Sequence, residues 1–300
     1  MKLTFLFFKY QTLNKRFKRD SQRAAFLLCV DFGDYGVMRK VSSSVGCPLS
    51  GRYVIRKIMS SEVLIKAIEF ANEHVVQLEM ENNYKYHAYS VGLYCSLIEL
   101  AQSFEVLTRD YVHTGALVLF RSFIEHYVDL KNLRNSESYV DVLDLDNGNS
   151  HLKQFKQAKD GNPYFSSLVY LADTEIPRIQ EENKELAEKL GKKKYSVLDK
   201  FQLAGMENEY KGLYAYLCSE AHSSLSSIVK RHFRKDDDKD HVELVVHASE
   251  PCESDIFYVA NMALYLSHAG SLVCEILDSD IKSKFDEHTQ SIQNSASKIT

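Results

Sequence analysis

The chain has 300 residues, a formal net charge of −4 and an apolar fraction of 45%, as is normal for a folded globular protein. Its four prolines and 12 glycines, with no tryptophan, provide few breakers, which argues against a fold of many short strands and favours long helices. The six cysteines show no C-x-x-C spacing, which argues against a zinc knuckle or a disulfide framework. They predict free thiols in a reducing, cytoplasmic environment.

The charge is unevenly divided along the chain. Residues 1–58 hold 12 Lys and Arg against 3 Asp and Glu, a net charge of +9, which leaves −13 for the remainder. An acidic body repels nucleic acid at long range, so an RNA-binding role requires a local basic patch or the N-terminal arm. Lys9 interrupts the first apolar run before a cleavable signal can form, and Ala24–Val30 is too short to cross a bilayer. We therefore expect no integral membrane insertion.

Three regions are predicted. Residues 1–58 are interpreted as a basic, poorly ordered N-terminal extension that ends in a Ser/Gly/Pro-rich stretch, with a nucleic-acid-binding or membrane-binding arm as the alternative. Residues 59–280 are predicted to form a single helical domain, whose first helix is capped by Ser60 and Ser61. Residues 281–300 form a polar tail that we expect to fray.

Apolar residues repeat at three and four positions through most of the predicted domain, which indicates amphipathic helices. Helices are expected from Ser60 to about residue 78, then over 84–105 and 111–134. Segment 135–162 is weaker, with a turn or loop at 144–149. A helix from Tyr164 should kink or break at Pro177, and the charged stretch that follows should end near Gly191.

The last third of the chain continues this pattern. Helices are expected over about 206–234 and 254–278, separated by a polar turn at 236–240. Residues 241–247 alternate briefly, which is typical of a short extended strand. The sequence therefore predicts an all-α fold, an irregular helical bundle, with one short β-strand or hairpin near 241–249.

The first candidate site residues lie in an apolar helix. Arg121 and Glu125 are four residues apart and share a helix face whose surroundings are too apolar for a solvated pair. We expect them to reach a second element or to line a cavity. A buried Arg–Glu pair that only fixes helix packing is the alternative. His126 follows directly and lies about 140° away from Arg121 around the helix.

A second polar group occurs near residue 220. Ser219 and His222 are three residues apart on one face, where a Ser–His contact can activate a nucleophile. The chain lacks the G-x-S-x-G elbow of hydrolases, so a hydrogen bond from His222 to the Arg121/Glu125 helix is the preferred interpretation. The eleven histidines form no H-E-x-x-H motif, and no phosphate-binding glycine loop is present. No metal and no cofactor are expected, although Glu125, His126, Glu220 and His222 could supply ligands if their helices met.

Two resemblances rest on these residues. Arg121-x3-Glu125, followed about 90 residues later by Tyr216-x2-Ser219-x2-His222, resembles a family of helical bacterial proteins known as a domain of unknown function, over roughly residues 85–275. This resemblance implies an all-helical fold with these polar side chains gathered in one pocket.

Arg121-x4-His126 also resembles the R-x4–6-H signature of HEPN-type helical ribonucleases from toxin–antitoxin and phage-defence systems. This resemblance implies metal-independent cleavage of RNA through its 2′-hydroxyl, in a cleft built by two subunits. Arginine then holds the scissile phosphate and histidine moves protons. The chain departs from that family at Ser122, where a stronger polar group is common, and in placing the motif on an early central helix.

Two functions follow as rival predictions. In the first, the protein is a ribonuclease with RNA and a second copy of the chain as partners. In the second, it is a non-catalytic helical binding protein, and the same side chains form a buried structural network. A site should be open to solvent, with Arg121 and a histidine in one positively charged cleft, whereas a network should pair its donors internally. The candidate catalytic residues are Arg121, Glu125, His126, Ser219 and His222.

Overall fold

The structure is a computed structural model that describes residues 49–81, 83–222, 224–236, 241–246 and 253–298. The chain divides into two units, Met1–Ser50 and Gly51–Thr300, and the description below concerns the second. The prediction for the basic extension falls almost entirely outside the described residues. The first helix within the described residues, α2, spans Leu49–Val75 and so begins before the start at Ser60 that the serine cap predicted.

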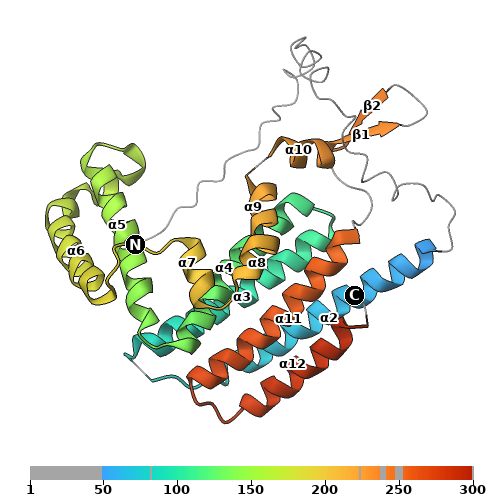
Figure 1. Cartoon of the computed structure of the whole chain (residues 1–300), viewed down its shortest axis with the longest axis horizontal. Coiled ribbons are helices and arrows are strands. Elements are labelled where there is room, and N and C mark those ends of the chain that lie inside the picture. The colour runs from blue at the N-terminus through green and yellow to red at the C-terminus, as the bar shows by residue number, and fades with distance from the viewer. Residues whose placement is uncertain (1–48, 82, 223, 237–240, 247–252, 299–300) are drawn as a thin grey trace, which may run out of the picture. The chain divides into compact units, whose positions relative to one another are not determined.

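Five long helices build the bundle (Figure 1). They are α2, α3 (Lys85–Arg109), α4 (His113–Asn135), α11 (Glu253–Ile276) and α12 (Lys282–Ala296). α3 packs on α4, and α11 contacts α3, α4 and α12. The predicted helices at 84–105, 111–134 and 254–278 correspond to α3, α4 and α11, so the all-α prediction is confirmed.

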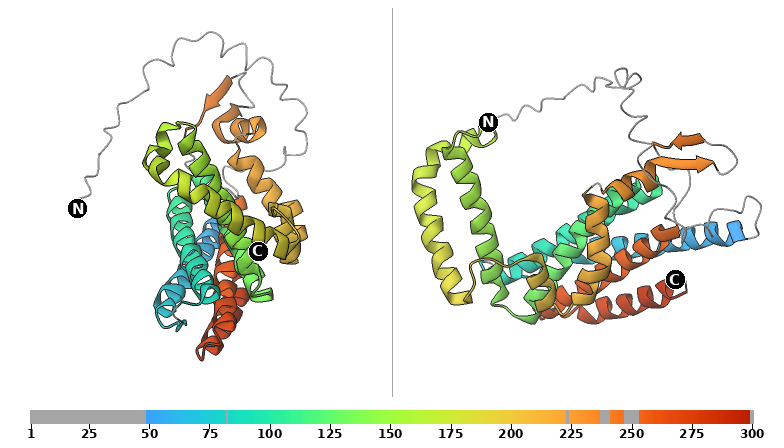
Figure 2. Two further views of the ribbon diagram at one scale, coloured as in Figure 1. Left: turned by 90° about the vertical axis from the view of Figure 1, so that its left-hand side faces the viewer. Right: turned by 45° about the horizontal axis from the view of Figure 1, so that its top comes forward.

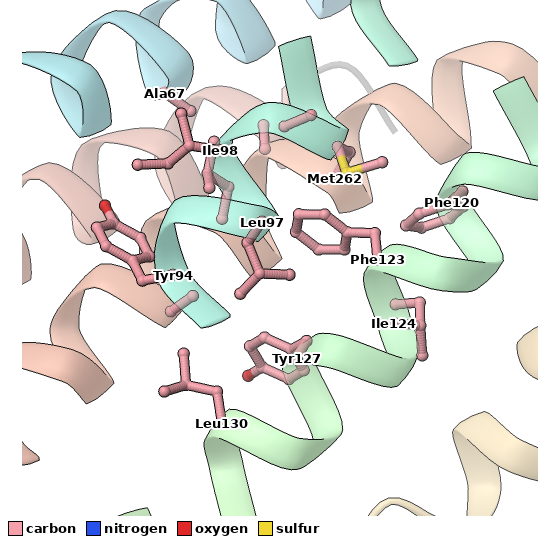
Figure 3. Close-up of a cluster of buried hydrophobic side chains, with 14 of the residues drawn as sticks. Ala67, Tyr94, Leu97, Ile98, Phe120, Phe123, Ile124, Tyr127, Leu130 and Met262 are labelled. Carbon is pink, nitrogen blue, oxygen red and sulfur yellow. The ribbon is translucent and has the colours of Figure 1, made fainter. Parts of the chain in front are cut away.

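The core lies where α2, α3, α4 and α11 meet (Figure 3). Phe120, Phe123 and Ile124 of α4 are fully buried, together with Leu97 of α3 and Met262 of α11. The buried residues of α4 recur in every turn from Ala116 to Leu133 because α3 and α11 both pack on it, whereas Val118 is 37% exposed. This burial fixes α4 as a rigid support for the polar side chains that it carries.

α5 (Tyr139–Lys159), the 3-10 helix η3 (Pro163–Leu168) and α6 (Val169–Leu190) form a helical hairpin (Figure 2). The prediction of a turn or loop at 144–149 is wrong, because this stretch is helical within α5. A Cβ on Gly148 would lie 2.1 Å from the side-chain oxygen of Asn183, so the glycine lets α6 approach closely. The expected break at Pro177 is also absent, since α6 continues through it and ends at Gly191 with a left-handed φ of 65°.

The helix expected over 206–234 is interrupted. α7 (Val197–Leu203) precedes it, and α8 (Glu207–Glu209), the π-helical segment η4 (Tyr210–Tyr214) and α9 (Ala215–Ala221) follow one another without a gap. α10 (Leu225–His232) starts anew, because the Ser224 side chain accepts a hydrogen bond from the amide of Ser227 and caps it.

α10 leads directly into a two-stranded antiparallel ribbon. β1 spans Phe233–Asp236 and β2 spans His241–Leu244. β2 lies inside the range 241–249, so the prediction of a short strand or hairpin there is confirmed. β1 replaces the end of the predicted helix.

The prediction that residues 281–300 form a fraying tail is wrong. α12 occupies much of the tail that was expected to fray, and it buries Phe285 and Ile292 against the bundle. α11 contains an apolar run, Ile256–Ile276, that is long enough to cross a membrane. Because 72% of its apolar window is buried inside the protein, it has the properties of a core helix.

Candidate functional site

Arg121 and Glu125 lie on α4, which packs against α9. Their four-residue spacing places both side chains on one face. Nη2 of Arg121 lies 2.9 Å from Oε1 of Glu125. The expectation that this pair reaches a second element is confirmed, because both residues contact Tyr214 of η4 and Arg121 also contacts Cys218 of α9.

Tyr214 completes the pair from the opposite side. Its hydroxyl donates to Oε1 of Glu125 at 2.5 Å and accepts a hydrogen bond from Nη2 of Arg121 at 3.0 Å. Nε of Arg121 donates to Sγ of Cys218 at 3.3 Å. The guanidinium carbon lies 5.4 Å from the centroid of the Tyr214 ring, within cation–π range. We call Arg121, Glu125, Tyr214 and Cys218 the Arg121 cluster.

The π-helical segment η4 supplies Tyr214. A π turn adds a residue to the helix, so it changes which side chains face a neighbouring element, and such turns recur at functional sites. Here Tyr214 ends the segment, and Cys218 lies one α-helical turn later on the same face. The rings of Phe201 and Tyr210 lie 5.0 and 5.5 Å from the Tyr214 ring and hold its orientation.

The Arg121 cluster is partly open to solvent and electrically balanced. The side chains of Arg121 and Glu125 are 26% and 34% exposed. Burial and the hydrogen bond to Glu125 raise the pKa of Tyr214, so its phenol remains a donor at neutral pH. Burial opposes the charge of Arg121, but its contacts with Cys218, Tyr214 and Glu125 raise its pKa overall. Because one cation faces one anion, the cluster is not a positively charged cleft.

Three predicted site residues lie outside the Arg121 cluster. Nδ1 of His126 lies 2.8 Å from the carbonyl oxygen of Ser122, one turn earlier on α4. Ser219 donates its hydroxyl to the carbonyl oxygen of Tyr216 at 2.7 Å. His222 is exposed and ends α9. Neither the expected bond from His222 to α4 nor a Ser219–His222 pair occurs among the contacts of the described residues.

The alternative of a metal site finds no support in the described part of the chain, where no group of three His, Cys, Asp or Glu side chains is close enough to hold an ion. Glu220, considered as a ligand partner of Glu125, has other contacts. It is 6% exposed, accepts a hydrogen bond from Ser227 at 2.8 Å and lies 3.8 Å from Nη1 of Arg231. The charge of Glu220 is therefore paired within the α9–α10 region.

A second polar network, which no sequence pattern indicates, joins α4, α5 and α7. Nζ of Lys200 lies 2.7 Å from Asp146 and 3.3 Å from Asp129, and Tyr139 donates to Asp129 at 2.5 Å. Asn132, only 2% exposed, donates to the carbonyl oxygen of Lys200 at 2.9 Å. Burial opposes the charge of Lys200, yet the two carboxylates raise its pKa overall. These contacts attach the α5–α6 hairpin to the bundle.

Two cavities in the described part of the chain lie away from the Arg121 cluster. One of about 530 Å³ is bordered by α3, α5 and α6, and one of about 640 Å³ lies between α5 and α6. Lys85, Arg178 and Lys189 line the first of them beside Asp144 and Glu182, so its charges are mixed. Neither cavity is lined by any residue of the Arg121 cluster, by His126 or by His222.

The molecule is thus an all-helical protein in which an Arg–Glu pair on a central helix is held by a tyrosine and a cysteine from a π-helical segment. The chain belongs to DUF5677, a family of unknown function, whose model matches residues 87–240. The matched region runs from α3 to the ribbon and contains the whole Arg121 cluster. The predicted membership of a helical family of unknown function is confirmed. Neither a curated protein nor a solved structure matches the chain significantly.

Proposed function

We propose that the protein is a non-catalytic helical interaction protein, in which the Arg121 cluster fixes η4 and α9 on α4. The observation that carries this proposal is the internal pairing of the cluster. Glu125 accepts a hydrogen bond from Tyr214 and forms an ion pair with Arg121, and Arg121 donates hydrogen bonds to Tyr214 and Cys218. Groups that pair with one another hold a structure, and a substrate that bound Nη2 of Arg121 or Oε1 of Glu125 would have to replace one of these contacts.

The surface supports an interaction role. The end of the α5–α6 hairpin exposes four large apolar side chains within a short stretch of chain. Tyr164 is 91% exposed, Tyr170 79%, Val169 49% and Leu171 38%. Exposed apolar side chains of this size, four of them close together in sequence, make this end of the hairpin a candidate for association.

A double-mutant cycle tests the proposal. Arg121→Leu and Tyr214→Phe should each lower the free energy of unfolding by about 1–3 kcal/mol. Their combination should cost less than the sum, with a coupling of about 1 kcal/mol, because the two side chains share one hydrogen bond. Arg109→Leu is the matched control: Arg109 also faces a glutamate four residues away but is 62% exposed, so its loss should cost under about 0.5 kcal/mol.

A catalytic site predicts the opposite result. Residues retained for chemistry are often neutral or unfavourable for stability. If Arg121→Leu and Tyr214→Phe leave the unfolding curve unchanged, or raise its midpoint, the cluster does not hold the fold and the proposal is wrong.

A metal-independent ribonuclease is the second candidate, and the orientation of His126 favours it. If Nδ1 carries the proton donated to the Ser122 carbonyl, Nε2 presents a free lone pair, as a general base requires. Arg121 would hold the phosphate. Because Arg121 and His126 leave α4 about 140° apart, one helix does not offer both to the same phosphate, and a second copy of the chain would have to complete the cleft. A role in defence belongs to this candidate alone.

Incubation of the full chain with total RNA and a tRNA pool in EDTA separates the two candidates. Interaction alone predicts intact RNA with every variant. Cleavage that disappears in both Arg121→Ala and His126→Ala, while their melting temperatures stay within about 2 °C of the original, would establish the ribonuclease and overturn the first proposal.

A further inference from the structure

The cavity of about 530 Å³ between α3, α5 and α6 follows the axis of α6. Its lining residues on α6 run at intervals of three and four from Arg178 to Lys189, a length of about 16 Å at 1.5 Å per residue. α5 contributes a second row of residues from Asp144 to His151. A hollow of about 420 Å³ adjoins this cavity, because Lys85 and Lys189 line both. We call the two together the hairpin cleft; its length matches about five residues of extended peptide.

Carboxylates outnumber cations along the hairpin cleft. Its lining includes three Lys and Arg side chains, Lys85, Arg178 and Lys189, against five Asp and Glu side chains, Glu137, Asp141, Asp144, Glu182 and Glu185. Arg178 already pairs with two glutamates of its own helix, Glu175 and Glu182. The remaining excess of negative charge favours a cationic ligand over an anionic one.

Two hydrogen-bond acceptors in the cleft have no donor within the described part of the chain. Asn183 is 8% exposed, and its Nδ2 donates to Oδ1 of Asn149 at 3.2 Å, but its own Oδ1 accepts no hydrogen bond there. This oxygen lies against Gly148 of the cleft wall, where a Cβ would come within 2.1 Å of it. Glu185, which is exposed on the same wall, forms no ion pair with a described residue. A buried acceptor beside an unpaired carboxylate favours a ligand that donates hydrogen bonds, and Arg and Lys side chains donate without accepting.

The two lysines of the cleft are weakly held. Lys85 pairs with Asp144 at 2.8 Å, but the lysine side chain is 67% exposed and the carboxylate only 20%. Lys189 pairs with Asp141 at 2.7 Å, with exposures of 65% and 17%. Ion pairs with so exposed a lysine contribute little to stability, so a cation of the ligand can displace either lysine into solvent. The ring of Tyr89 lies on the same wall, and tyrosine rings attract cations.

We propose that the hairpin cleft binds an extended basic segment of a partner protein, whose arginine or lysine side chains donate to Glu185 and to Oδ1 of Asn183. A carboxylate can accept two parallel hydrogen bonds from one guanidinium, which fixes the orientation of the ligand as well as its charge. Asn147, exposed on the same wall, offers a carboxamide that can pair with the backbone of the peptide. A polyamine carries the same charge but has no peptide backbone, so the peptide is the better match.

The inference rests on the proposed interaction function, to which it adds the chemistry of the partner. It assigns the contact to a part of the molecule away from the Arg121 cluster, since no residue of that cluster lines the cleft. Loss of binding at the cleft therefore need not change the stability that the cluster provides. The two can be tested by different variants and different measurements.

Fluorescence anisotropy on the full chain tests the proposal, with a fluorescein-labelled penta-arginine peptide as the probe. Glu185→Gln keeps the size of the side chain and removes its charge, so it should weaken binding at least about tenfold. Glu188→Gln is the matched control. Glu188 is also an exposed glutamate of α6 without an ion pair to a described residue, but it lines the cavity of about 640 Å³ instead. Its substitution should change the dissociation constant less than about twofold at physiological salt, where distant charges are screened. Both variants should keep the melting temperature of the original chain.

Competition with unlabelled ligands identifies the occupant. Penta-arginine should displace the probe, spermine should displace it more weakly, and penta-glutamate should not displace it. Equal weakening by Glu185→Gln and Glu188→Gln would show a diffuse attraction to an acidic surface and would overturn the proposal. So would an absence of binding at physiological salt, or tighter binding of spermine than of the peptide. The Arg121–Tyr214 coupling and RNA cleavage are measured separately, so failure of the proposed function is distinguishable from failure of the cleft.

Discussion

His288 should make the protein lose stability in mild acid. The imidazole stacks on Phe70 with ring centroids 3.8 Å apart and an interplanar angle of 4°, and Phe70 stacks in turn on His74 at 4.1 Å. Nε2 of His288 is buried and has no hydrogen-bond partner in the described structure. Burial and the nearby His74 lower the pKa of His288 from 6.5 to about 4.

The sign follows from comparing the two states. Between pH 6.5 and about 4 the unfolded chain binds a proton at this histidine and the folded chain does not, so stability falls as the pH falls. Without solvent screening, a pKa difference of this size between the folded and unfolded states corresponds to a loss of about 3 kcal/mol in the free energy of unfolding. Because the imidazole is only partly buried, solvent screening reduces the expected loss to roughly 1–2 kcal/mol.

The assay is urea unfolding followed by circular dichroism at several pH values between 7.5 and 4.5. His288→Phe keeps the aromatic stack and cannot titrate, so it should remove roughly 1–2 kcal/mol of the acid-dependent loss. Other titrating groups cancel in the difference between the two proteins. His151→Gln removes a histidine from an exposed position on α5 and is the control, which should lose as much stability in acid as the original chain does. An equal acid-dependent loss in His288→Phe and the original protein would refute the reasoning.

Three further substitutions have expected outcomes that thermal and urea unfolding can measure. Gly270→Ala should destabilise by about 1–3 kcal/mol, because its Cβ would lie 2.4 Å from the buried ring of Phe285. Gly92→Ala should instead stabilise α3 by up to about 1 kcal/mol, since nothing lies within 4 Å of that Cβ; a loss of stability would contradict this. Lys200→Met should cost about 3 kcal/mol, because it leaves Asp129 and its neighbouring carboxylate without their cation; an unchanged midpoint would show that the carboxylates need no partner.

The sequence predicts the bundle helices well because their apolar periods are long. It misplaces the loop at 144–149, where Asp and Asn favour turns in isolation. In the folded chain Leu145 is buried, Lys85 contacts Asp144 and Lys200 contacts Asp146, and these tertiary contacts outweigh local preference.

The candidate site is predictable in part. The Arg121–Glu125 pair stands out because charge is unexpected in an apolar helix. Tyr214 and Cys218 are harder to find, because tyrosine and cysteine in an apolar helix are ordinary core residues, whereas Ser219 and His222 draw attention as possible catalytic groups. The available signal is the four-residue spacing of Tyr214 and Cys218 around the buried Leu217.

The α5–α6 hairpin has a small core of its own. Leu145, Ala158, Ala172 and Ile179 are buried but stand apart from the main hydrophobic cluster. Only the first turns of α5 enter that cluster, through Tyr139 and Val142, and polar contacts add to this attachment. Such a unit can open by itself at a lower free energy than global unfolding. In native-state hydrogen exchange its amides should therefore form a separate, faster class than those of α3, α4 and α11. Limited proteolysis should cut near its tip while the bundle stays folded.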